Sequence, residues 1–289
     1  MLTSNNLKDY ILIDAGNKEK LESWNGIILR RPDPMALWPT NTNKLWDNPD
    51  GFYHRSSNGG GNWTFNKKLK ESWTINYRNL KFKVSPTNFK HTGIFPEQAS
   101  NWDFIYETIS NSKDNDFKVL NMFAYSGIAT MVASSAGASE VVHVDASKGM
   151  ISWAKDNQNL SNLNNNLIRY INEDCNKFML REIRRNRKYK GIIMDPPSYG
   201  RGPNNELFKF EDQINNLLDN AFKLLDKDAS FLILNTYTTG YSTSVLTNLM
   251  NYYKDKYNMG GKVLCEEIGI KIKDQDKCLS CGFTTRWYK

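Results

Sequence analysis

Three aspartates in the second half of the chain each follow a short apolar run. Asp145 ends VVHVD, Asp174 follows LIRYINE, and Asp195 ends GIIMD. In nucleotide-binding α/β sheets, an acidic residue about 20 residues after the first glycine turn accepts hydrogen bonds from a ribose diol. Asp145 lies 18 residues after Gly127, so we predict that it binds a ribose. Asp174, at the end of the next predicted strand, could accept a hydrogen bond from an adenine amino group.

The turn before these acids contains a single glycine. The run KVLNMF leads into AYSGIAT, in which Gly127 precedes a predicted helix. A Gly-x-Gly-x-x-Gly phosphate loop needs more glycines, and a Walker loop needs Gly-Lys-Ser/Thr. We infer that this turn lets a ligand pass close to the backbone without cradling a pyrophosphate.

The third acid begins the segment Asp195-Pro196-Pro197-Ser198-Tyr199. Each proline fixes its own φ and keeps the residue before it out of the helical region, so we predict a rigid, extended loop. One acid or serine at a strand end is most often a helix N-cap. Successive strands that each end in an acid, after a glycine turn, point instead to one ligand site.

Parallel strands that alternate with helices would bring these residues to one edge of a sheet. After residue 117, apolar runs alternate with amphipathic stretches, which is typical of βαβ units and of a parallel sheet covered on both faces. The predicted strands are 118–123, 141–144, 167–171, 191–194, 230–234 and 263–268, and the predicted helices lie near 127–136, 148–160, 175–186, 211–225 and 242–256. The predicted fold class is therefore α/β, with a Rossmann-like, doubly wound, mostly parallel sheet that binds ligands at its carboxyl edge.

The first 90 residues have a different pattern, of short alternating segments around turns. Asn25-Gly26 separates 19–24 from 27–31, and Arg78-Asn79 separates 73–77 from 80–84. Asn-Gly between two such runs is a strong hairpin signal. We predict a small antiparallel β domain over 1–90 and a catalytic domain over 91–289.

Most of the positive charge lies in the N-terminal part. The chain has 38 Lys+Arg and 31 Asp+Glu, a net charge of +7, and residues 1–90 hold 14 of the former and 8 of the latter. The same part holds Trp24, Trp38, Trp46, Trp63 and Trp73. Cations beside flat rings are typical of surfaces that contact phosphates and stacked bases. Alternatively, the tryptophans fill the core of this domain and the lysines keep it soluble.

Composition excludes several classes of protein. With 39% apolar and 12% aromatic residues, the chain can bury enough surface to fold. We expect neither export nor membrane insertion, because no apolar run reaches about 18 residues and the start has no signal-peptide pattern. Four scattered cysteines fit a reducing cytoplasm, and three separate histidines, at 54, 91 and 143, do not form a metal-ligand set.

The sequence resembles the class I S-adenosylmethionine-dependent methyltransferases and, more narrowly, the ribosomal RNA large-subunit methyltransferases, which include cytosine-C5 and guanine-N7 enzymes. The motifs that carry the resemblance are HTGIFPEQ at 91–98, VLNMFAYSGIAT at 119–130, VDAS at 144–147, Glu173-Asp174, DPPSYGRG at 195–202 and CGFTTRW at 281–287, the last of which would close the sheet as an antiparallel strand. The resemblance covers about residues 80–289. The N-terminal part is similar to the β domain of shorter members, and we recognise no PUA-type RNA-binding module.

The resemblance implies S-adenosyl-L-methionine as cofactor, S-adenosyl-L-homocysteine as product, RNA (here 23S ribosomal RNA) as substrate, and no metal. It implies that the cofactor-binding residues are Thr92, Phe95, Gln98, Asn121, Phe123, Ala124, Tyr125, Gly127, Asp145, Ala146, Ser147, Asp174, Cys175 and Asp195. The implied transfer-site residues are Asp195, Pro196, Pro197, Ser198 and Tyr199, and Tyr199 would offer a ring for stacking on the target base.

The cysteines bear on which atom is methylated. Methylation at C5 of cytosine needs a thiolate that adds to the ring. The cytosine-C5 relatives carry a cysteine after the fifth strand, where this chain has Thr236, Tyr237 and Thr238. We therefore favour a ring nitrogen or an exocyclic amine as the acceptor. Cytosine-C5 chemistry through Cys281 is the alternative, although most cysteines are small buried apolar residues.

Two further classes stay open. A methyltransferase of the same fold could act on a small molecule or a protein, and the domain could bind S-adenosylmethionine without catalysis; the intact Asp-Pro-Pro-Ser-Tyr argues against the latter.

The basic run from Arg181 to Lys190 has the composition of an RNA-binding motif. Because it ends a helix that starts at the carboxyl edge, we predict that it lies at the opposite edge of the sheet as a solvated helix end.

Overall fold

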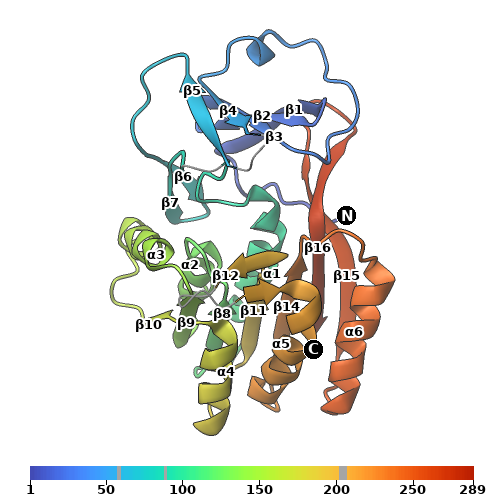
Figure 1. The fold of residues 1–289 in the computed structure, drawn as a ribbon. Helices are drawn as coiled ribbons and strands as arrows, with labels where there is room; N and C mark the ends of the chain where they lie inside the picture. The colour runs from blue at the N-terminus through green and yellow to red at the C-terminus, as the bar shows by residue number, and fades with distance from the viewer. Residues whose placement is uncertain (57–59, 88–89, 202–206) are drawn as a thin grey trace. The chain divides into compact units, whose positions relative to one another are not determined.

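The computed structural model describes residues 1–56, 60–87, 90–201 and 207–289 (Figure 1). They form two compact units: an N-terminal unit of residues 1–100 and 268–281, and a sheet unit of residues 101–267 and 282–289. The chain therefore divides after Ser100, ten residues beyond the proposed boundary at 90, and the N-terminal unit also takes in part of the C-terminal third. Among the described residues, no helix is both long and apolar enough to cross a bilayer.

The sheet unit is built on a seven-stranded sheet with the order β10-β9-β8-β11-β14-β16-β15. The strands are β8 (Lys118–Met122), β9 (Glu140–Asp145), β10 (Ile168–Asn172), β11 (Gly191–Met194), β14 (Phe231–Thr236), β15 (Lys262–Lys271) and β16 (Cys278–Tyr288). β8 pairs in parallel with β9 and β11, and β10 and β14 extend the parallel part on either side. β16 pairs antiparallel with β14, so the predicted mostly parallel sheet and its antiparallel last strand are confirmed.

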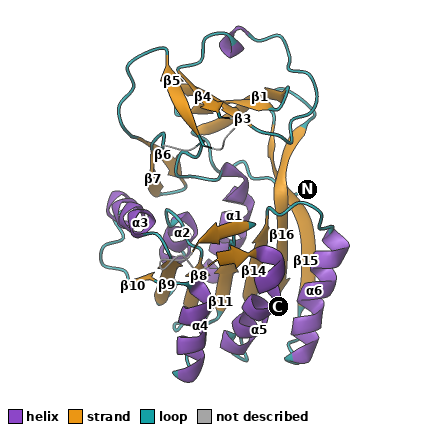
Figure 2. Ribbon diagram, in the orientation of Figure 1, coloured by secondary structure: helices purple, strands orange, loops and turns teal. Residues whose placement is uncertain are grey.

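Helices cover both faces of this sheet (Figure 2). They are α1 (Ala99–Ser110), α2 (Ile128–Ser135), α3 (Lys148–Leu160), α4 (Cys175–Arg184), α5 (Phe210–Leu224) and α6 (Thr243–Lys256). α4, α5 and α6 pack side by side, and α2 packs on α3. Because both faces are covered, β11 and β14 are buried along their whole length, which explains the continuous apolar runs IIM in β11 and FLIL in β14. The core includes Leu120, Met194 and Leu232 from the strands, Phe178 from α4 and Leu218 from α5.

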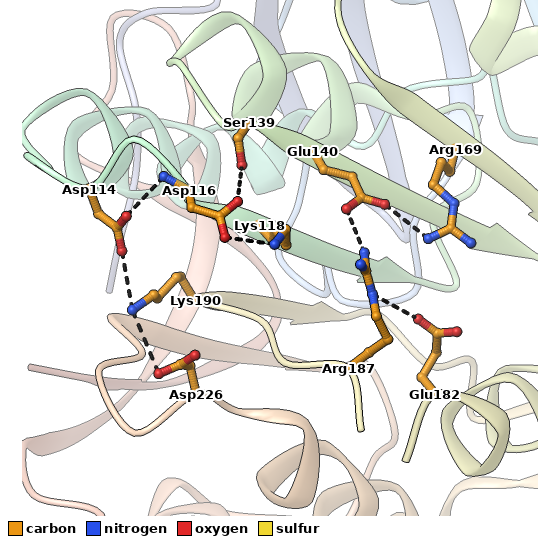
Figure 3. Close-up of polar contacts among 10 residues, drawn as sticks. All are labelled: Asp114, Asp116, Lys118, Ser139, Glu140, Arg169, Glu182, Arg187, Lys190 and Asp226. Atoms are coloured by element: carbon orange, nitrogen blue, oxygen red, sulfur yellow. Dashed lines mark hydrogen bonds and ion pairs between the residues drawn. The ribbon is translucent and has the colours of Figure 1, made fainter. Parts of the chain in front are cut away.

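Ion pairs hold the amino edge of the sheet (Figure 3). Glu140, at the start of β9, pairs with Arg169 at 2.9 Å and with Arg187 at 2.5 Å. Lys190, just before β11, pairs with Asp114 at 3.1 Å and with Asp226 at 3.6 Å. The end of the basic run, at Arg187 and Lys190, therefore lies at the amino edge as predicted, with its charge partly neutralised by carboxylates. The first member, Arg181, instead pairs with Glu173 (2.6 Å), which follows the carboxyl end of β10.

The N-terminal unit contains a five-stranded sheet, β1-β2-β3-β4-β5, and a separate hairpin, β6-β7. Its strands are β1 (Tyr10–Gly16), β2 (Glu19–Trp24), β3 (Ile27–Pro32), β4 (Gly51–Arg55), β5 (Gly61–Phe65), β6 (Trp73–Tyr77) and β7 (Leu80–Val84). Both predicted hairpins are present, but the sheet is not wholly antiparallel as expected. β3 pairs in parallel with β4, because the 18 residues between them, 33–50, cross back before β4 begins.

A buried ion-pair cluster sits on β2 and β3. Glu22 is fully buried and accepts hydrogen bonds from Arg31 (2.6 and 2.7 Å) and from the Tyr10 hydroxyl (2.7 Å). Burial opposes ionisation of Glu22, but Arg31 and Lys20 outweigh it and lower the pKa of that carboxyl to about 2. Trp24 is also fully buried here and Trp46 is buried as well, so two of the five tryptophans serve the core of this unit.

Candidate active site

The glycine turn between β8 and α2 has an unusual backbone. Phe123, Tyr125 and Gly127 have φ values of 55°, 51° and 81°, in the left-handed region that only glycine adopts without strain. The Ala124 amide donates to the Val144 carbonyl (3.1 Å), and the Tyr125 amide donates to Asp145 Oδ2 (2.8 Å). These two bonds tie the strained turn to the end of β9, so the acid and the turn form one structure.

Gly127 is required by packing as well as by its backbone angle. A Cβ at this position would lie 2.8 Å from Ala154 Cβ on α3 and 3.2 Å from His143 Cε1 on β9. Contacts below 3.0 Å essentially do not occur for real Cβ atoms, and Ala154 has no flexible end that could move aside. The missing side chain therefore lets α2 start directly above β9.

A buried chain of polar side chains lies beneath this turn. Asn121 on β8 donates to the Thr130 hydroxyl (2.9 Å), and that hydroxyl contacts His143 Nδ1 (3.0 Å). Burial lowers the pKa of His143 to about 3, so its ring is neutral at physiological pH. The predicted cofactor residue Asn121 is thus directed under the turn. Neither Thr130 nor His143 was predicted to be part of the site, and only their positions within VLNMFAYSGIAT and VVHVD could have suggested it.

Asp145 is the centre of the predicted ribose site. Its Oδ1 accepts from the Ser147 amide and its Oδ2 from the Tyr125 amide, both at 2.8 Å. Burial raises the pKa of this carboxyl, and the two amides partly offset that effect. The Asn172 side chain donates to the carbonyls of Asp145 and Ala146 (3.1 and 2.9 Å), which joins the ends of β9 and β10.

Asp174 is the N-cap of α4, and its predicted contact with adenine stays a prediction. Its Oδ1 accepts from the Lys177 amide (2.9 Å) at the start of α4, so one of its two oxygens has the ordinary helix-capping role. Cys175 follows as the first residue of α4 and is buried in the core, and burial raises the pKa of its thiol well above its ordinary value. At the carboxyl edge of the sheet, Cys175 therefore packs as a buried apolar residue.

The Asp-Pro-Pro segment leaves β11 between the ends of β8 and β14. The Asp195 amide donates to the Met122 carbonyl (3.4 Å). The Thr238 hydroxyl, in the loop after β14, donates to the Ser198 hydroxyl (2.8 Å) and links the two loops. Tyr199 is 58% exposed. Thr238 was noted in the sequence only as part of the segment 236–238 that lacks a cysteine, and its partner lies 40 residues away in the chain.

Three predicted cofactor residues belong to the N-terminal unit. Thr92 and Gln98 are buried there, and the Phe95 ring lies 5.3 Å from that of His91. Gln98 ends a short 3-10 turn, Pro96–Gln98, that leads directly into α1. Their approach to a cofactor stays a prediction. Gly202, in the DPPSYGRG motif, lies outside the described residues.

The donors and acceptors at the carboxyl edge of the seven-stranded sheet suit a nucleoside with a ribose diol. Each carboxylate oxygen has two acceptor positions, so the two backbone bonds at Asp145 leave capacity for two ribose hydroxyls. Asp174 Oδ2 remains able to accept from an exocyclic amine. Among the described residues, no group of three or more His, Cys, Asp and Glu side chains could hold a metal ion. A doubly wound sheet with this edge is typical of proteins that bind a nucleoside-containing cofactor.

Comparison with known proteins gives the family. Residues 51–239 match the family model described as S-adenosylmethionine-dependent methyltransferase. The solved structure of an S-adenosylmethionine-dependent methyltransferase from Agrobacterium tumefaciens is 36% identical, covers 99% of this chain and 92% of its own, and superposes with a TM-score of 0.94. The chain belongs to the S-adenosylmethionine-dependent methyltransferases. It is an enzyme of this class, and S-adenosylmethionine is its cofactor.

Curated relatives match part of the chain. The ribosomal RNA large subunit methyltransferase K/L of Colwellia psychrerythraea is 27% identical over 170 residues, which is 58% of this chain and 23% of that protein. Its counterpart in Pseudoalteromonas translucida is 31% identical over 145 residues, which is 50% of this chain and 19% of that protein. The chain thus matches a quarter or less of the length of these relatives.

Proposed function

We propose that this enzyme methylates RNA, specifically large-subunit ribosomal RNA, at a ring nitrogen or exocyclic amine of a base. The names of the curated relatives support ribosomal RNA as the substrate class, although they match only part of each protein. An RNA substrate of this kind would be met in the cytoplasm.

The observation that carries the RNA substrate is a surface at the edge of the N-terminal sheet. On β5, the rings of Trp63 and Phe65 stack in parallel, with centroids 5.8 Å apart and planes 7° apart, and Phe65 is 44% exposed. Lys68 and Lys70 are exposed directly after this strand. Base–aromatic stacking beside lysines that contact phosphates is how proteins hold single strands.

The preference for nitrogen rests on the state of the thiols. In the segment 236–238, where the cytosine-C5 relatives carry a cysteine, the Thr238 hydroxyl donates to Ser198. Burial, reinforced by the negative charge of Glu97, raises the pKa of the Cys281 thiol well above its ordinary value. Covalent catalysis needs a thiolate, and this environment disfavours one. Cys281 therefore suits a structural role better than a nucleophilic one.

The proposed mechanism is positioning together with electrostatics. The cofactor supplies an electrophilic methyl group on a sulfonium. Asp145 and the glycine turn hold the nucleoside end, while Ser198 and Thr238 fix the loop that orients the acceptor base. With an exocyclic amine as acceptor, the Asp195 carboxylate would accept a hydrogen bond from the N–H and take its proton as the new N–C bond forms and the S–CH3 bond breaks, with S-adenosyl-L-homocysteine as the leaving group. With a ring nitrogen that carries no N–H, the same carboxylate would stabilise the positive charge that the base gains.

The test is to offer labelled S-adenosylmethionine with unmodified ribosomal RNA, with bulk protein, and with a small-molecule extract. We expect label in RNA alone, and RNA binding that weakens steeply as salt rises, because phosphate contacts release counterions. Label in protein or small molecules, with none in RNA, would contradict the proposal and favour the other methyltransferase class. Cofactor binding without label in any pool would favour a non-catalytic module.

A further inference from the structure

A short hairpin follows the Asp-Pro-Pro segment and has two different faces. β12 (Tyr199–Arg201) pairs antiparallel with β13 (Leu207–Lys209), with Tyr199 opposite Lys209 and Gly200 opposite Phe208. Because side chains alternate along a strand, Tyr199, Leu207 and Lys209 share the outer face, and Phe208 lies on the inner face.

The inner face fixes the hairpin to the glycine turn. Phe208 is buried, and its ring packs edge-to-face on Phe123, with centroids 5.4 Å apart. The Phe210 amide donates to the Ser198 carbonyl (3.1 Å), which closes the base of the hairpin. Gly200 lies against Pro197, and a Cβ there would come within 3.1 Å of that ring. The hairpin is therefore held beside the glycine turn and the Asp-Pro-Pro loop.

The outer face is exposed and carries apolar groups beside a cation. Tyr199 is 58% exposed and Leu207 48% exposed, and Lys209 is exposed as well. Diagonal neighbours on an antiparallel pair lie close enough for long side chains to form one surface. The acidic Glu211 and Asp212 lie in the first turn of α5, where they offset the helix dipole. The hairpin face itself combines a ring, an aliphatic side chain and an ammonium group.

We infer that this outer face holds the nucleotide next to the target base, with Leu207 against that neighbouring base and Lys209 on its phosphate, while Tyr199 stacks on the target base itself. This inference rests on the proposed RNA substrate. The occupant is a single-stranded RNA nucleotide, because the face adjoins the transfer loop and pairs apolar surface with positive charge, as nucleotide-binding grooves do. The hairpin thus adds a second RNA contact within the sheet unit, separate from the β5 surface.

The test uses the double variant Leu207→Ala/Lys209→Gln with Lys113→Gln as a matched control. Lys113 is exposed in the same unit, in the loop before β8 at the amino edge. The measurements are kcat and KM for RNA, the salt dependence of RNA binding, and S-adenosylmethionine affinity by calorimetry, all on the full chain. Both replaced side chains are exposed, so folding is expected to be unchanged, and a thermal melt checks it.

We expect the double variant to raise the RNA KM about fivefold or more and to reduce the salt slope by about 0.7, as for one lost phosphate contact on a single strand. We expect kcat and cofactor affinity within about twofold of wild type, and no change in the control. An unchanged RNA KM in an active enzyme would overturn the hairpin inference alone. If the wild type methylates no RNA, the proposed function and this inference both fall.

Discussion

Replacing Gly127 by alanine tests how the glycine turn is built. At φ +81°, alanine carries a backbone cost of about 1–2 kcal/mol. The added Cβ would also meet Ala154 Cβ at 2.8 Å and His143 Cε1 at 3.2 Å. Crowding of this kind in a packed interior costs about 1–3 kcal/mol. We therefore expect Gly127→Ala to lower the free energy of unfolding by about 2–5 kcal/mol.

Gly137→Ala is the matched control. Gly137 follows the other end of α2 with φ +107°, and a Cβ there would have no neighbour within 4 Å. Its backbone angle lies further from the left-handed helical minimum, so its backbone cost is at least as large as at Gly127. Any excess destabilisation at Gly127 is therefore caused by the crowding and gives a lower limit for its cost.

Urea unfolding of the two variants gives this comparison directly, with the m-value as a check on two-state behaviour. We also expect S-adenosylmethionine affinity to fall in Gly127→Ala alone, because the crowding displaces the turn that carries Tyr125 and its bond to Asp145. If Gly127→Ala is no more destabilising than Gly137→Ala, the packing account of this turn is wrong.

Three other predictions follow from the structure. Asp145→Asn should weaken S-adenosylmethionine binding by about 1.5–3 kcal/mol in calorimetry, as expected when hydrogen bonds to a charged group are lost; an unchanged affinity would remove Asp145 from the site. The Glu22 pKa of about 2, against 4.5 for the free group, corresponds to on the order of 3 kcal/mol of stability that is fully present above pH 4.5 and is lost as pH falls toward 2. Urea unfolding of wild type and Glu22→Gln should therefore differ most at neutral pH and converge on acidification, and a constant difference would contradict the ion-pair account. Arg184→Gln/Arg185→Gln should change RNA methylation by less than about threefold, because exposed helix-end charges contribute little; a collapse of RNA binding would make this run part of the RNA surface.

The sheet and its acidic edge were predictable because they depend on local patterns. Apolar runs marked the parallel strands, since a strand buried on both faces must be apolar throughout. Asp145 and Asp195 ended two of these runs, and the structure brings both to the carboxyl edge. The helix α1 was missed although Trp102, Ile105 and Ile109 have helical spacing and are buried.

Other parts of the site depend on contacts that no local pattern reveals. The Ser198–Thr238 bond joins residues 40 positions apart, and the Phe123–Phe208 contact depends on a hairpin of three-residue strands. From the sequence, the Asn121 amide could face either a ligand or the protein interior. Its hydrogen bond to Thr130, which in turn contacts His143, shows that it faces the interior. The parallel pairing of β3 with β4 likewise depends on how a long connection crosses the sheet.

Nucleoside mass spectrometry of ribosomal RNA tests the central claim most directly. Unmodified RNA would be incubated with labelled S-adenosylmethionine and wild type, Asp195→Ala or Cys281→Ala, then digested to nucleosides. We predict a label on a base nitrogen, lost with Asp195→Ala and kept with Cys281→Ala. Labelled 5-methylcytidine that disappears with Cys281→Ala would contradict the account and establish covalent catalysis by that thiol.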